Sequence, residues 1–377
     1  MARDTTIGAS FGGARLSELE IQAVVRVGNK NAWRRTLTFW NESIPKCCWT
    51  TLHPPFYIFL TWKGAVNAMK INSLISCARS LLLAAGLSVA GVAAASEAVV
   101  SADWLVAHLD DPNVRVVEVS VEPGKFERAH IPGAVNFRWH TELVDPVRRD
   151  IAPREQWEQL LSTAGIGPDT TVVLYGDNNN WFAAWGAWIF RYYGHADVKL
   201  LDGGRNKWEA DRRPLSNRPA RHAATEYRVS STQPALRARL ADVLAVVEGE
   251  RQAKLLDIRS PAEFEGRIFA PPGVQELAIR AGHVPGAKNV PWGSVVRDDG
   301  TFKSTDELRA LYAGIGIDGS EPVIVYCRIG ERSAHSWFVL SQILGYDAVQ
   351  YDGSWTEYGN SVGVPISNPA GTVWGGT

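Results

Sequence analysis

The residues best suited to chemistry lie in the segment C-R-I-G-E-R-S, which begins at Cys327. The apolar residues 323–326 before it are typical of a buried strand, so Cys327 ends a strand and opens a loop. Arg328 and Arg332 add positive charge, which favours the nucleophilic thiolate. Gly330 allows the backbone to turn closely around the sulfur. The segment therefore predicts a reactive thiol inside a pocket that selects a small anion.

The spacing of this segment indicates which atom the thiol takes up. A thiolate that displaces a leaving group from a small anion attacks either a sulfur or a phosphorus centre. Cysteine phosphatases wrap a phosphate with the spacing C-x5-R, whereas Cys327 and Arg332 give C-x4-R. We expect the shorter loop to suit a terminal sulfur, which disfavours a phosphatase or an arsenate reductase. An inert buried thiol is the structural alternative.

Four sequence blocks occur twice in the same order, about 150 residues apart, and indicate a duplicated domain. The first copy contains V-R-V-V-E-V-S, A-H-I-P-G-A-V-N-F, T-V-V-L-Y-G-D and L-L-D-G-G-R-N-K-W. The second contains K-L-L-D-I-R-S, G-H-V-P-G-A-K-N-V, P-V-I-V-Y-C-R and Q-Y-D-G-S-W. Aligning Tyr175 with Tyr326 places Gly176 opposite Cys327, so only the second copy carries the nucleophile.

Both copies alternate β-branched runs with amphipathic windows, which predicts an α/β fold. We expect two tandem domains, each a mostly parallel sheet flanked by helices. The predicted strands are 114–119, 172–175, 255–258 and 323–326, and the predicted helices include 155–163, 307–312 and 333–344. The expected boundaries are a first domain at 96–214, a linker at 215–236, a second domain at 237–366 and a tail at 367–377, with an insertion at 263–279.

Other notable side chains are interpreted as structural. His130 and His283 stand in H-x-P-G-A turns in both copies, outside the cysteine loop, and we expect them to form hydrogen bonds within the fold. Asp257 and Arg259 are expected to pair with each other, and Trp355 either walls the pocket or packs in the core. A stripe of tryptophans at helical spacing is expected in the core and comprises Trp181, Trp185 and Trp188.

The N-terminal part of the chain contains a pattern typical of a secretory signal peptide at 69–95. Basic residues follow Met69, residues 81–92 are apolar, and three alanines precede Ser96. We expect a cleaved signal, a mature start near Ser96 and a periplasmic or secreted protein; an uncleaved membrane anchor is the alternative. Residues 1–68 are interpreted as mis-annotated or unstructured sequence, or else as a small domain. Cleavage would leave Cys327 without another cysteine to pair with, since the others are Cys47, Cys48 and Cys77.

The composition narrows the class of partner. The chain of 377 residues carries 39 basic and 40 acidic side chains, a formal net charge of -1. That balance gives no electrostatic footprint for nucleic acid. No basic amphipathic stretch indicates a membrane surface, so no stable membrane association is expected once the signal is cleaved.

The two H-x-P-G-A turns, the D-G-G-x-x-x-W and D-G-S-W blocks and the C-R-x-G loop together resemble the rhodanese family of sulfurtransferases. The resemblance covers residues 97–366 and is to the type with two tandem domains, of which the second is catalytic. It implies that the Cys327 thiolate takes the outer sulfur of thiosulfate, releases sulfite, and passes the sulfur from a persulfide to cyanide or a thiol. It implies no metal and no organic cofactor.

The resemblance also implies substrate-binding roles for particular residues. Arg328, Gly330 and Arg332 would hold the donor, and Arg191 in W-I-F-R-Y-Y-G-H would reach the anion from the first domain. The loop departs from the usual thiosulfate-type C-R-K-G, because Ile329 replaces the lysine, which leaves the donor open. A 3-mercaptopyruvate sulfurtransferase is one alternative, although its usual C-G-S/T-G loop lacks an arginine at position 328. A non-enzymatic sulfur-carrier or binding module is the other.

Overall fold

The structure is a computed structural model that describes residues 22–27, 31–36, 58–59, 98–274 and 278–374. The chain divides into two compact units, Met1–Gly91 and Val92–Thr377, which are treated separately. In the first unit, β1 (Gln22–Val27), β2 (Asn31–Thr36) and β3 (Ile58–Phe59) form an antiparallel sheet in the order β2-β1-β3. The predicted signal peptide at 69–95 lies outside the described residues. It stays a prediction, as does the interpretation of residues 1–68.

The second unit begins with a five-stranded parallel sheet built from the first sequence copy. Its order is β4-β10-β9-β5-β6, and every neighbouring pair is parallel. Short β-branched runs without internal polar periodicity form the central strands, because both faces of a parallel sheet are covered. The strands are β4 (Val99–Val100), β5 (Val114–Glu118), β6 (Val135–Asn136), β9 (Thr171–Tyr175) and β10 (Val198–Leu201).

The second sequence copy forms another parallel sheet with the same connectivity. Its order, β11-β15-β14-β12-β13, repeats the first sheet strand for strand. The strands are β11 (Arg237–Ala238), β12 (Lys254–Asp257), β13 (Lys288–Asn289), β14 (Val323–Tyr326) and β15 (Ala348–Tyr351). The predicted duplication and the predicted α/β class are confirmed, and the four predicted strands agree with the observed ones to within one residue.

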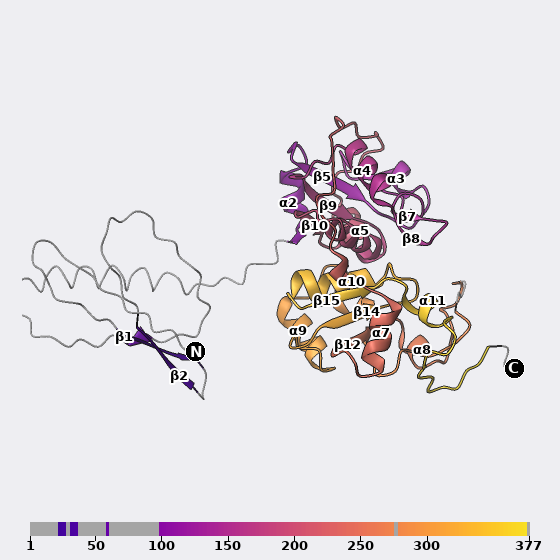
Figure 1. Cartoon of the computed structure of the whole chain (residues 1–377). Helices are drawn as coiled ribbons and strands as arrows, with labels where there is room; N and C mark the ends of the chain where they lie inside the picture. Colours follow the sequence, from indigo (N-terminus) through magenta and orange to yellow (C-terminus); the bar gives the residue numbers. More distant parts are fainter. Residues whose placement is uncertain (1–21, 28–30, 37–57, 60–97, 275–277, 375–377) are drawn as a thin grey trace, which may run out of the picture. The chain divides into compact units, whose positions relative to one another are not determined.

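Helices cover both sheets, as Figure 1 shows. Their starts follow local chemistry: Ser101, Ser260 and Ser304 each accept a backbone N–H of the first helical turn. The first copy contains α2 (Ala102–Ala107), α3 (Lys125–Arg128), α4 (Arg154–Thr163), α5 (Trp181–Tyr192) and α6 (Gly204–Ala210). The second contains α7 (Leu240–Val247), α8 (Pro261–Phe264), α9 (Thr305–Ala313), α10 (Ser333–Phe338) and α11 (Ser354–Tyr358).

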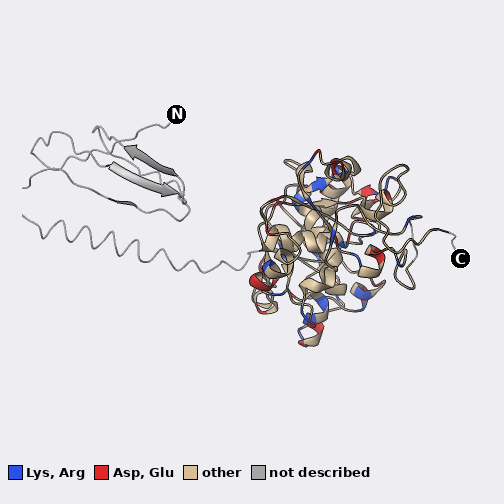
Figure 2. Cartoon of the chain, turned by 90° about the horizontal axis from the view of Figure 1, so that it is seen from below, with Lys and Arg blue, Asp and Glu red and all other residues tan. Residues whose placement is uncertain are grey.

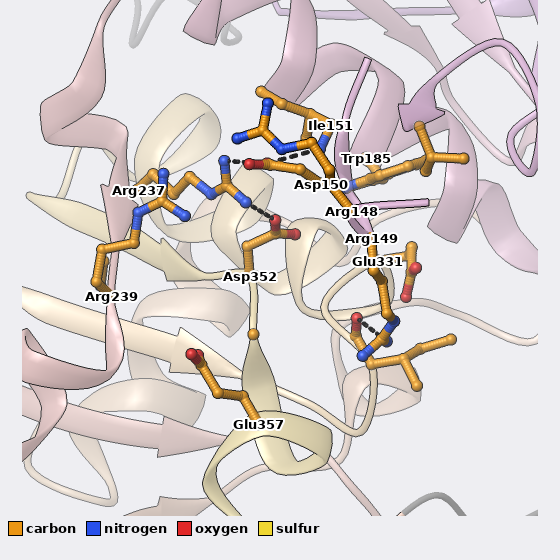
Figure 3. A pocket seen from close by; sticks show the side chains of 14 residues that line it. Arg148, Arg149, Asp150, Ile151, Trp185, Arg237, Arg239, Glu331, Asp352 and Glu357 are labelled. Atoms are coloured by element: carbon orange, nitrogen blue, oxygen red, sulfur yellow. Dashed lines mark hydrogen bonds and ion pairs between the residues drawn. The ribbon is translucent and has the colours of Figure 1, made fainter. Parts of the chain in front are cut away.

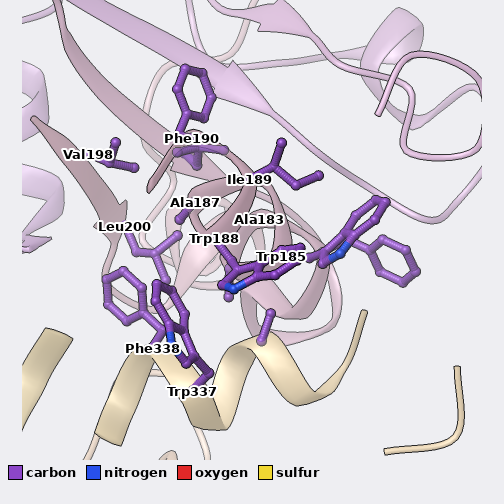
Figure 4. Close-up of a cluster of buried hydrophobic side chains, with 14 of the residues drawn as sticks. Ala183, Trp185, Ala187, Trp188, Ile189, Phe190, Val198, Leu200, Trp337 and Phe338 are labelled. Carbon is purple, nitrogen blue, oxygen red and sulfur yellow. The ribbon is translucent and has the colours of Figure 1, made fainter. Parts of the chain in front are cut away.

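The two copies pack against each other through α5 and α10, which face one another at their boundary (Figure 1). Trp185 and Trp188 of α5 lie in one hydrophobic cluster with Trp337 and Phe338 of α10 (Figure 4). The first turn after α10, residues 339–343, is π-helical, so the predicted helix 333–344 is present but changes its winding. A single core that spans both copies holds the second domain's cysteine loop against the first domain.

The histidines of the H-x-P-G-A turns and the Asp257–Arg259 pair form contacts within the fold, as expected. His130 makes ring-nitrogen hydrogen bonds to the Phe126 and Arg218 carbonyls, and His283 makes one to the Phe264 carbonyl. Asp257 and Arg259 form a fully buried ion pair at 2.6 Å. Their counterpart in the first copy is a buried pair between Glu118 and Arg205, which bridges β5 and α6. Paired buried charges of this kind fix the ends of the central strands.

The charge distribution of the described body matches the balanced composition. Basic and acidic segments are interspersed along the ribbon of residues 98–374 rather than gathered by sign (Figure 2). Among the residues that the structure describes, no helix is both long and apolar enough to cross a bilayer.

Candidate active site

Cys327 lies at the carboxyl end of β14, where parallel sheets place their ligands. Its side chain is fully buried, and it is the free cysteine of the described residues. The backbone N–H of Gly330 donates to Cys327 Sγ at 3.1 Å. A backbone donor at this distance stabilises negative charge on sulfur.

Ser354, at the start of α11, fixes the other side of Cys327. Its hydroxyl accepts the Cys327 backbone N–H at 3.0 Å, lies 3.9 Å from Sγ and donates to the Tyr351 carbonyl at 2.8 Å. Ser354 has a backbone φ of 50°, a conformation that non-glycine residues seldom adopt. Backbone strain of this kind, here beside a side chain with three polar contacts, is often found at functional sites.

The equivalent loop of the first copy keeps the backbone path and lacks the thiol. There Gly204 has a φ of 57°, and Asn180 Oδ1 instead of a serine hydroxyl accepts the Gly176 N–H at 2.9 Å. Asp177 accepts two backbone N–H groups, from Val121 and Glu122, at 2.9 Å each. The polar side chains Asp177 and Asn180 of this loop therefore form hydrogen bonds within the first domain. The change from D-G-G in the first copy to D-G-S in the second is the sequence signal that distinguishes Ser354.

Gly330 is in a conformation that excludes other residues. Its φ is 108°, and a Cβ built on it would overlap the carbonyl oxygen of Asp352. The Ser333 hydroxyl donates to the Gly330 carbonyl at 2.6 Å, which ties the loop to the start of α10. The glycine predicted for a close turn is thus required by both its backbone angle and its surroundings.

The two arginines of the loop border a small cavity of about 80 Å³ between the domains. Arg332 lies over the Trp181 ring, with its guanidinium carbon 5.8 Å from the ring centroid, an arrangement that holds the cation in place. Trp185 and Trp188 are in the core as expected, but Trp181 is only partly buried and lines this cavity, which corrects its assignment as core. The lining residues are Trp181, Phe182, Pro271, Val274, Arg328, Ile329, Glu331 and Arg332.

Two residues of the lining, Pro271 and Val274, come from the insertion at 263–279, whose role the sequence did not reveal. Trp355, by contrast, packs in the core: it is 1% exposed, and the Arg259 guanidinium lies 4.5 Å from its ring centroid. Of the two roles considered for Trp355, the structure supports core packing.

A larger cavity of about 320 Å³ also borders the cysteine loop and is shown in Figure 3. It is lined by both domains and by charged groups of both signs. The first domain contributes the hairpin of β7 (Val144–Asp145) and β8 (Asp150–Ile151). The lining side chains labelled in Figure 3 are Arg148, Arg149, Asp150, Ile151, Trp185, Arg237, Arg239, Glu331, Asp352 and Glu357.

The first-domain arginine that reaches the loop is Arg149, not Arg191. Arg149 Nη2 donates to the Ile329 carbonyl at 3.3 Å, from a backbone φ of 54°. Arg191 lies in the last turn of α5, about 15 Å along the helix axis from Trp181, which contacts the loop. Burial lowers the Arg191 pKa and Asp197 opposes this, so its charged neighbour belongs to the first domain. The structure therefore does not bring Arg191 to the site, and no sequence pattern marks Arg149.

No cluster of three or more potential metal-ligating side chains occurs within residues 98–274 and 278–374 or in the described strands of the first unit. The polar groups recorded around Cys327 Sγ are the Gly330 backbone N–H and the Ser354 hydroxyl, and Arg328 and Arg332 follow in the same loop.

The rhodanese-like domain pattern matches residues 101–211 and 240–361, one match on each sheet domain described above. The chain belongs to the rhodanese family, and its tandem arrangement is that of the two-domain sulfurtransferases.

Relatives of this rhodanese are similar over nearly their whole length. A protein of Mycobacterium tuberculosis, named provisionally as a thiosulfate sulfurtransferase, is 51% identical over 272 residues, which is 72% of this chain and 97% of the relative. The sulfur carrier protein TtuD of Thermus thermophilus is 50% identical over 275 residues, 72% of this chain and 96% of its own.

Solved structures share the fold. The 3-mercaptopyruvate sulfotransferase SseA of Escherichia coli matches with a TM-score of 0.59 and 29% identity, over 68% of this chain and 98% of that one. An anaerobic ergothioneine biosynthesis enzyme of Chlorobium limicola has a TM-score of 0.62 at 24% identity, over 72% of this chain and 70% of that one, a likeness of fold alone.

The cysteine loop of this rhodanese contains a buried carboxyl group, that of Glu331. The residue lines both cavities, its side chain is buried, and its Oε2 atom has no hydrogen-bond partner. Burial raises its pKa to about 8, Asp352 adds to the effect, and Arg149 and Arg328 oppose it. At neutral pH the carboxyl group therefore holds a proton inside the catalytic loop.

This proton makes the stability of the rhodanese pH-dependent. The unfolded carboxyl ionises near 4.5 and the folded one near 8, so the folded state binds the extra proton between these values. The contribution of the Glu331 carboxyl to the free energy of unfolding is fully present below pH 4.5 and is lost as the pH rises through 8. We expect the unfolding free energy of wild type to fall relative to Glu331→Gln by up to about 1.4 kcal/mol per pH unit in this window. Urea unfolding of both proteins from pH 5 to 9 measures this, and parallel curves would contradict it.

Arg237 joins the two rhodanese domains beside the larger cavity. Its guanidinium forms ion pairs of 2.6 Å with Asp150 of the first-domain hairpin and 2.6 Å with Asp352 of the second domain (Figure 3). Burial opposes ionisation of Asp150, but the hydrogen bond and charge of Arg237 hold its pKa below the usual value. Asp352 is more deeply buried, and burial raises its pKa despite the same partner.

Replacing Arg237 would remove the short ion pairs of Asp150 and Asp352 and leave only the longer-range charge of Arg239 near both. We expect Arg237→Leu to lower the unfolding free energy by about 2–4 kcal/mol, because removing one member of a buried ionic cluster leaves the other charges uncompensated. Arg251→Leu is the matched control, since Arg251 and Asp242 form an exposed pair worth at most about 1 kcal/mol. Equal losses in denaturant unfolding of the two variants would contradict the account.

Proposed function

We propose that this rhodanese is a thiosulfate sulfurtransferase in which Cys327 carries the transferred sulfur as a persulfide. The observation that carries the proposal is the sulfur of Cys327 at the end of β14. It accepts the Gly330 N–H at 3.1 Å, next to a small cavity lined by Arg328 and Arg332. The name given to the mycobacterial relative points in the same direction.

The reaction has two half-steps on one sulfur. In the first, the Cys327 thiolate attacks the outer sulfur of thiosulfate, the S–S bond of the donor breaks, and its electron pair leaves with sulfite. In the second, an acceptor nucleophile such as cyanide or a thiolate attacks the outer sulfur of the persulfide, and the electron pair returns to Sγ. The Gly330 N–H stabilises the charge on Sγ in the starting and final states.

The small size of the smaller cavity and the arginines among its lining residues support thiosulfate as donor. A space of about 80 Å³ suits a compact inorganic anion, and Arg328 and Arg332 among its lining residues carry charge opposite to that of the donor. Mercaptopyruvate, the donor named for the Escherichia coli enzyme, is the rival. Steady-state kinetics with both donors and cyanide as acceptor test the choice. We expect the higher kcat/KM with thiosulfate, and a clear preference for mercaptopyruvate would refute the assignment.

A sulfur carrier without turnover is the second candidate, suggested by the name of the Thermus thermophilus relative. Both functions form the Cys327 persulfide, and they differ in how its outer sulfur is released. Multiple turnovers with thiosulfate and cyanide support the enzyme. A single loading event per chain, with release only to a protein partner, would support the carrier.

We also propose export of the protein through the signal peptide at 69–95, with cleavage before Ser96. N-terminal sequencing of the protein from its natural host is expected to start near Ser96. Peptides from residues 1–68 in that material would overturn both the cleavage and the interpretation of the upstream segment.

A further inference from the structure

The side chain of Glu331 has no part in the reaction as proposed above, although it lies between Gly330 and Arg332 in the cysteine loop. Together with Arg328 and Arg332 it lines the smaller cavity, the proposed donor site. The residue is 8% exposed, and its Oε2 atom is buried without a hydrogen-bond partner. A buried polar atom left unpaired is costly, and a bound molecule is one means of satisfying it.

The first domain shows what a side chain at this position does when it only holds the loop together. There the counterpart of Glu331 is Asn180, four residues after Gly176. Asn180 is buried, its Oδ1 atom accepts the Gly176 N–H at 2.9 Å, and its Nδ2 atom donates to a backbone carbonyl at 2.6 Å. In the second domain the Ser354 hydroxyl accepts the equivalent N–H, that of Cys327. The catalytic loop therefore closes without the carboxyl group of Glu331, which is available to a ligand.

The surroundings of Glu331 decide what its carboxyl group offers to a ligand. Arg328 and Arg332 belong to its own loop, Arg149 comes from the first-domain hairpin, and Asp352 follows β15. Because burial raises the pKa of Glu331 to about 8, the carboxyl group is neutral at pH 7 and its O–H donates a hydrogen bond. A neutral donor beside two guanidinium groups suits the oxygens of a dianion, whereas a carboxylate would repel them. The other charged residues that share a cavity wall with Glu331 are Arg148, Asp150, Arg237, Arg239 and Glu357 (Figure 3).

We propose that Glu331 is a donor-binding residue, whose protonated carboxyl group donates a hydrogen bond to an oxygen of the thiosulfate in the smaller cavity. The inference rests on the proposed function and deepens it by making donor binding depend on the protonation of one loop residue. The proton stays on Glu331 throughout, so the sulfur transfer at Cys327 is written as before. Ionisation of Glu331 removes the hydrogen bond and places a negative charge against the donor.

The test measures donor binding without chemistry. It uses the full-length protein with Cys327→Ala, in which no catalytic thiol titrates and no sulfur is transferred. The dissociation constant of thiosulfate is measured by titration calorimetry from pH 7 to pH 9. If thiosulfate binds only the protonated form of Glu331, a pKa of about 8 makes the dissociation constant rise about tenfold over this range.

Three further substitutions are made in the same Cys327→Ala protein. Glu331→Gln keeps a hydrogen-bond donor of similar size and does not ionise, so its dissociation constant should change less than about twofold between pH 7 and pH 9. Glu331→Leu lacks the donor, and we expect it to bind thiosulfate about tenfold more weakly at pH 7. Glu357→Gln is the matched control, because this carboxyl group lines only the larger cavity; the tenfold rise should remain.

A rise of the same size in the Glu331→Gln protein would overturn the inference. So would a dissociation constant of the Cys327→Ala protein that does not change with pH, or the absence of thiosulfate binding to it. The proposed function fails separately: thiosulfate that binds to the Cys327→Ala protein but forms no persulfide on Cys327 would refute the sulfurtransferase and leave the role of Glu331 in anion binding standing.

Discussion

Replacing Cys327 by serine is expected to reduce sulfur transfer by at least about 1,000-fold, because a hydroxyl neither ionises near neutral pH nor forms a persulfide. The loss should appear in both the overall rate and the first half-step, since the same sulfur accepts and donates the transferred atom. The side chain is fully buried, and the serine oxygen would still receive the Gly330 N–H. The fold is therefore expected to persist, with a cost of about 1–3 kcal/mol for burying a hydroxyl.

Cys327→Ala is the companion variant, because it removes the nucleophile without adding a polar atom to the core. Both variants are assayed with thiosulfate and cyanide, and their thermal unfolding is recorded to show that the chain is folded. Residual activity of either folded variant within tenfold of wild type would mean that another group carries the sulfur.

Gly330→Ala is expected to lower kcat/KM by about 100-fold or more. A Cβ at this position would overlap the Asp352 carbonyl oxygen and lie 2.9 Å from Asp352 Oδ1, at a φ of 108° that alanine seldom adopts. The loop has to shift, and with it the N–H that donates to Sγ. A displacement of about 1 Å in such a site costs about 100-fold in rate.

The matched control for this variant is Gly316→Ala. Gly316 also has a positive φ, 80°, but a Cβ there would meet no atom within 4 Å. We expect it to cost about 1–2 kcal/mol of stability from the backbone angle alone and to leave the rate within about twofold of wild type. Comparable activities for the two variants would show that the Gly330 geometry does not matter to the reaction.

The sequence alone was sufficient for the duplicated architecture and for the centre of the site. A continuous β-branched run such as residues 323–326 in an α/β chain is typical of a buried parallel strand. The residue that follows such a strand lies at the carboxyl edge of the sheet, where ligands bind. That reasoning located Cys327 and the loop through Arg332. Gly330 followed because a short loop around one atom needs a backbone conformation that only glycine adopts readily.

The parts that the sequence did not reveal depend on contacts between distant segments. Arg149 reaches the Ile329 carbonyl, 180 positions away, from an exposed hairpin with no periodicity, so nothing local marks it. Arg191 was predicted because of its neighbours in sequence, yet its place in the last turn of α5 directs it away from the loop. Trp181 has the same helical spacing as Trp185 and Trp188, and only the packing of α5 on α10 shows that it faces a cavity.

Mass spectrometry of the protein after treatment with thiosulfate shows whether Cys327 takes up the donor's sulfur. We expect a gain of one sulfur atom per chain, located on the peptide that contains Cys327, removed by cyanide and absent from Cys327→Ser. A protein that remains unmodified after thiosulfate, or that acquires the sulfur on Cys47, Cys48 or Cys77 and not on Cys327, would contradict it.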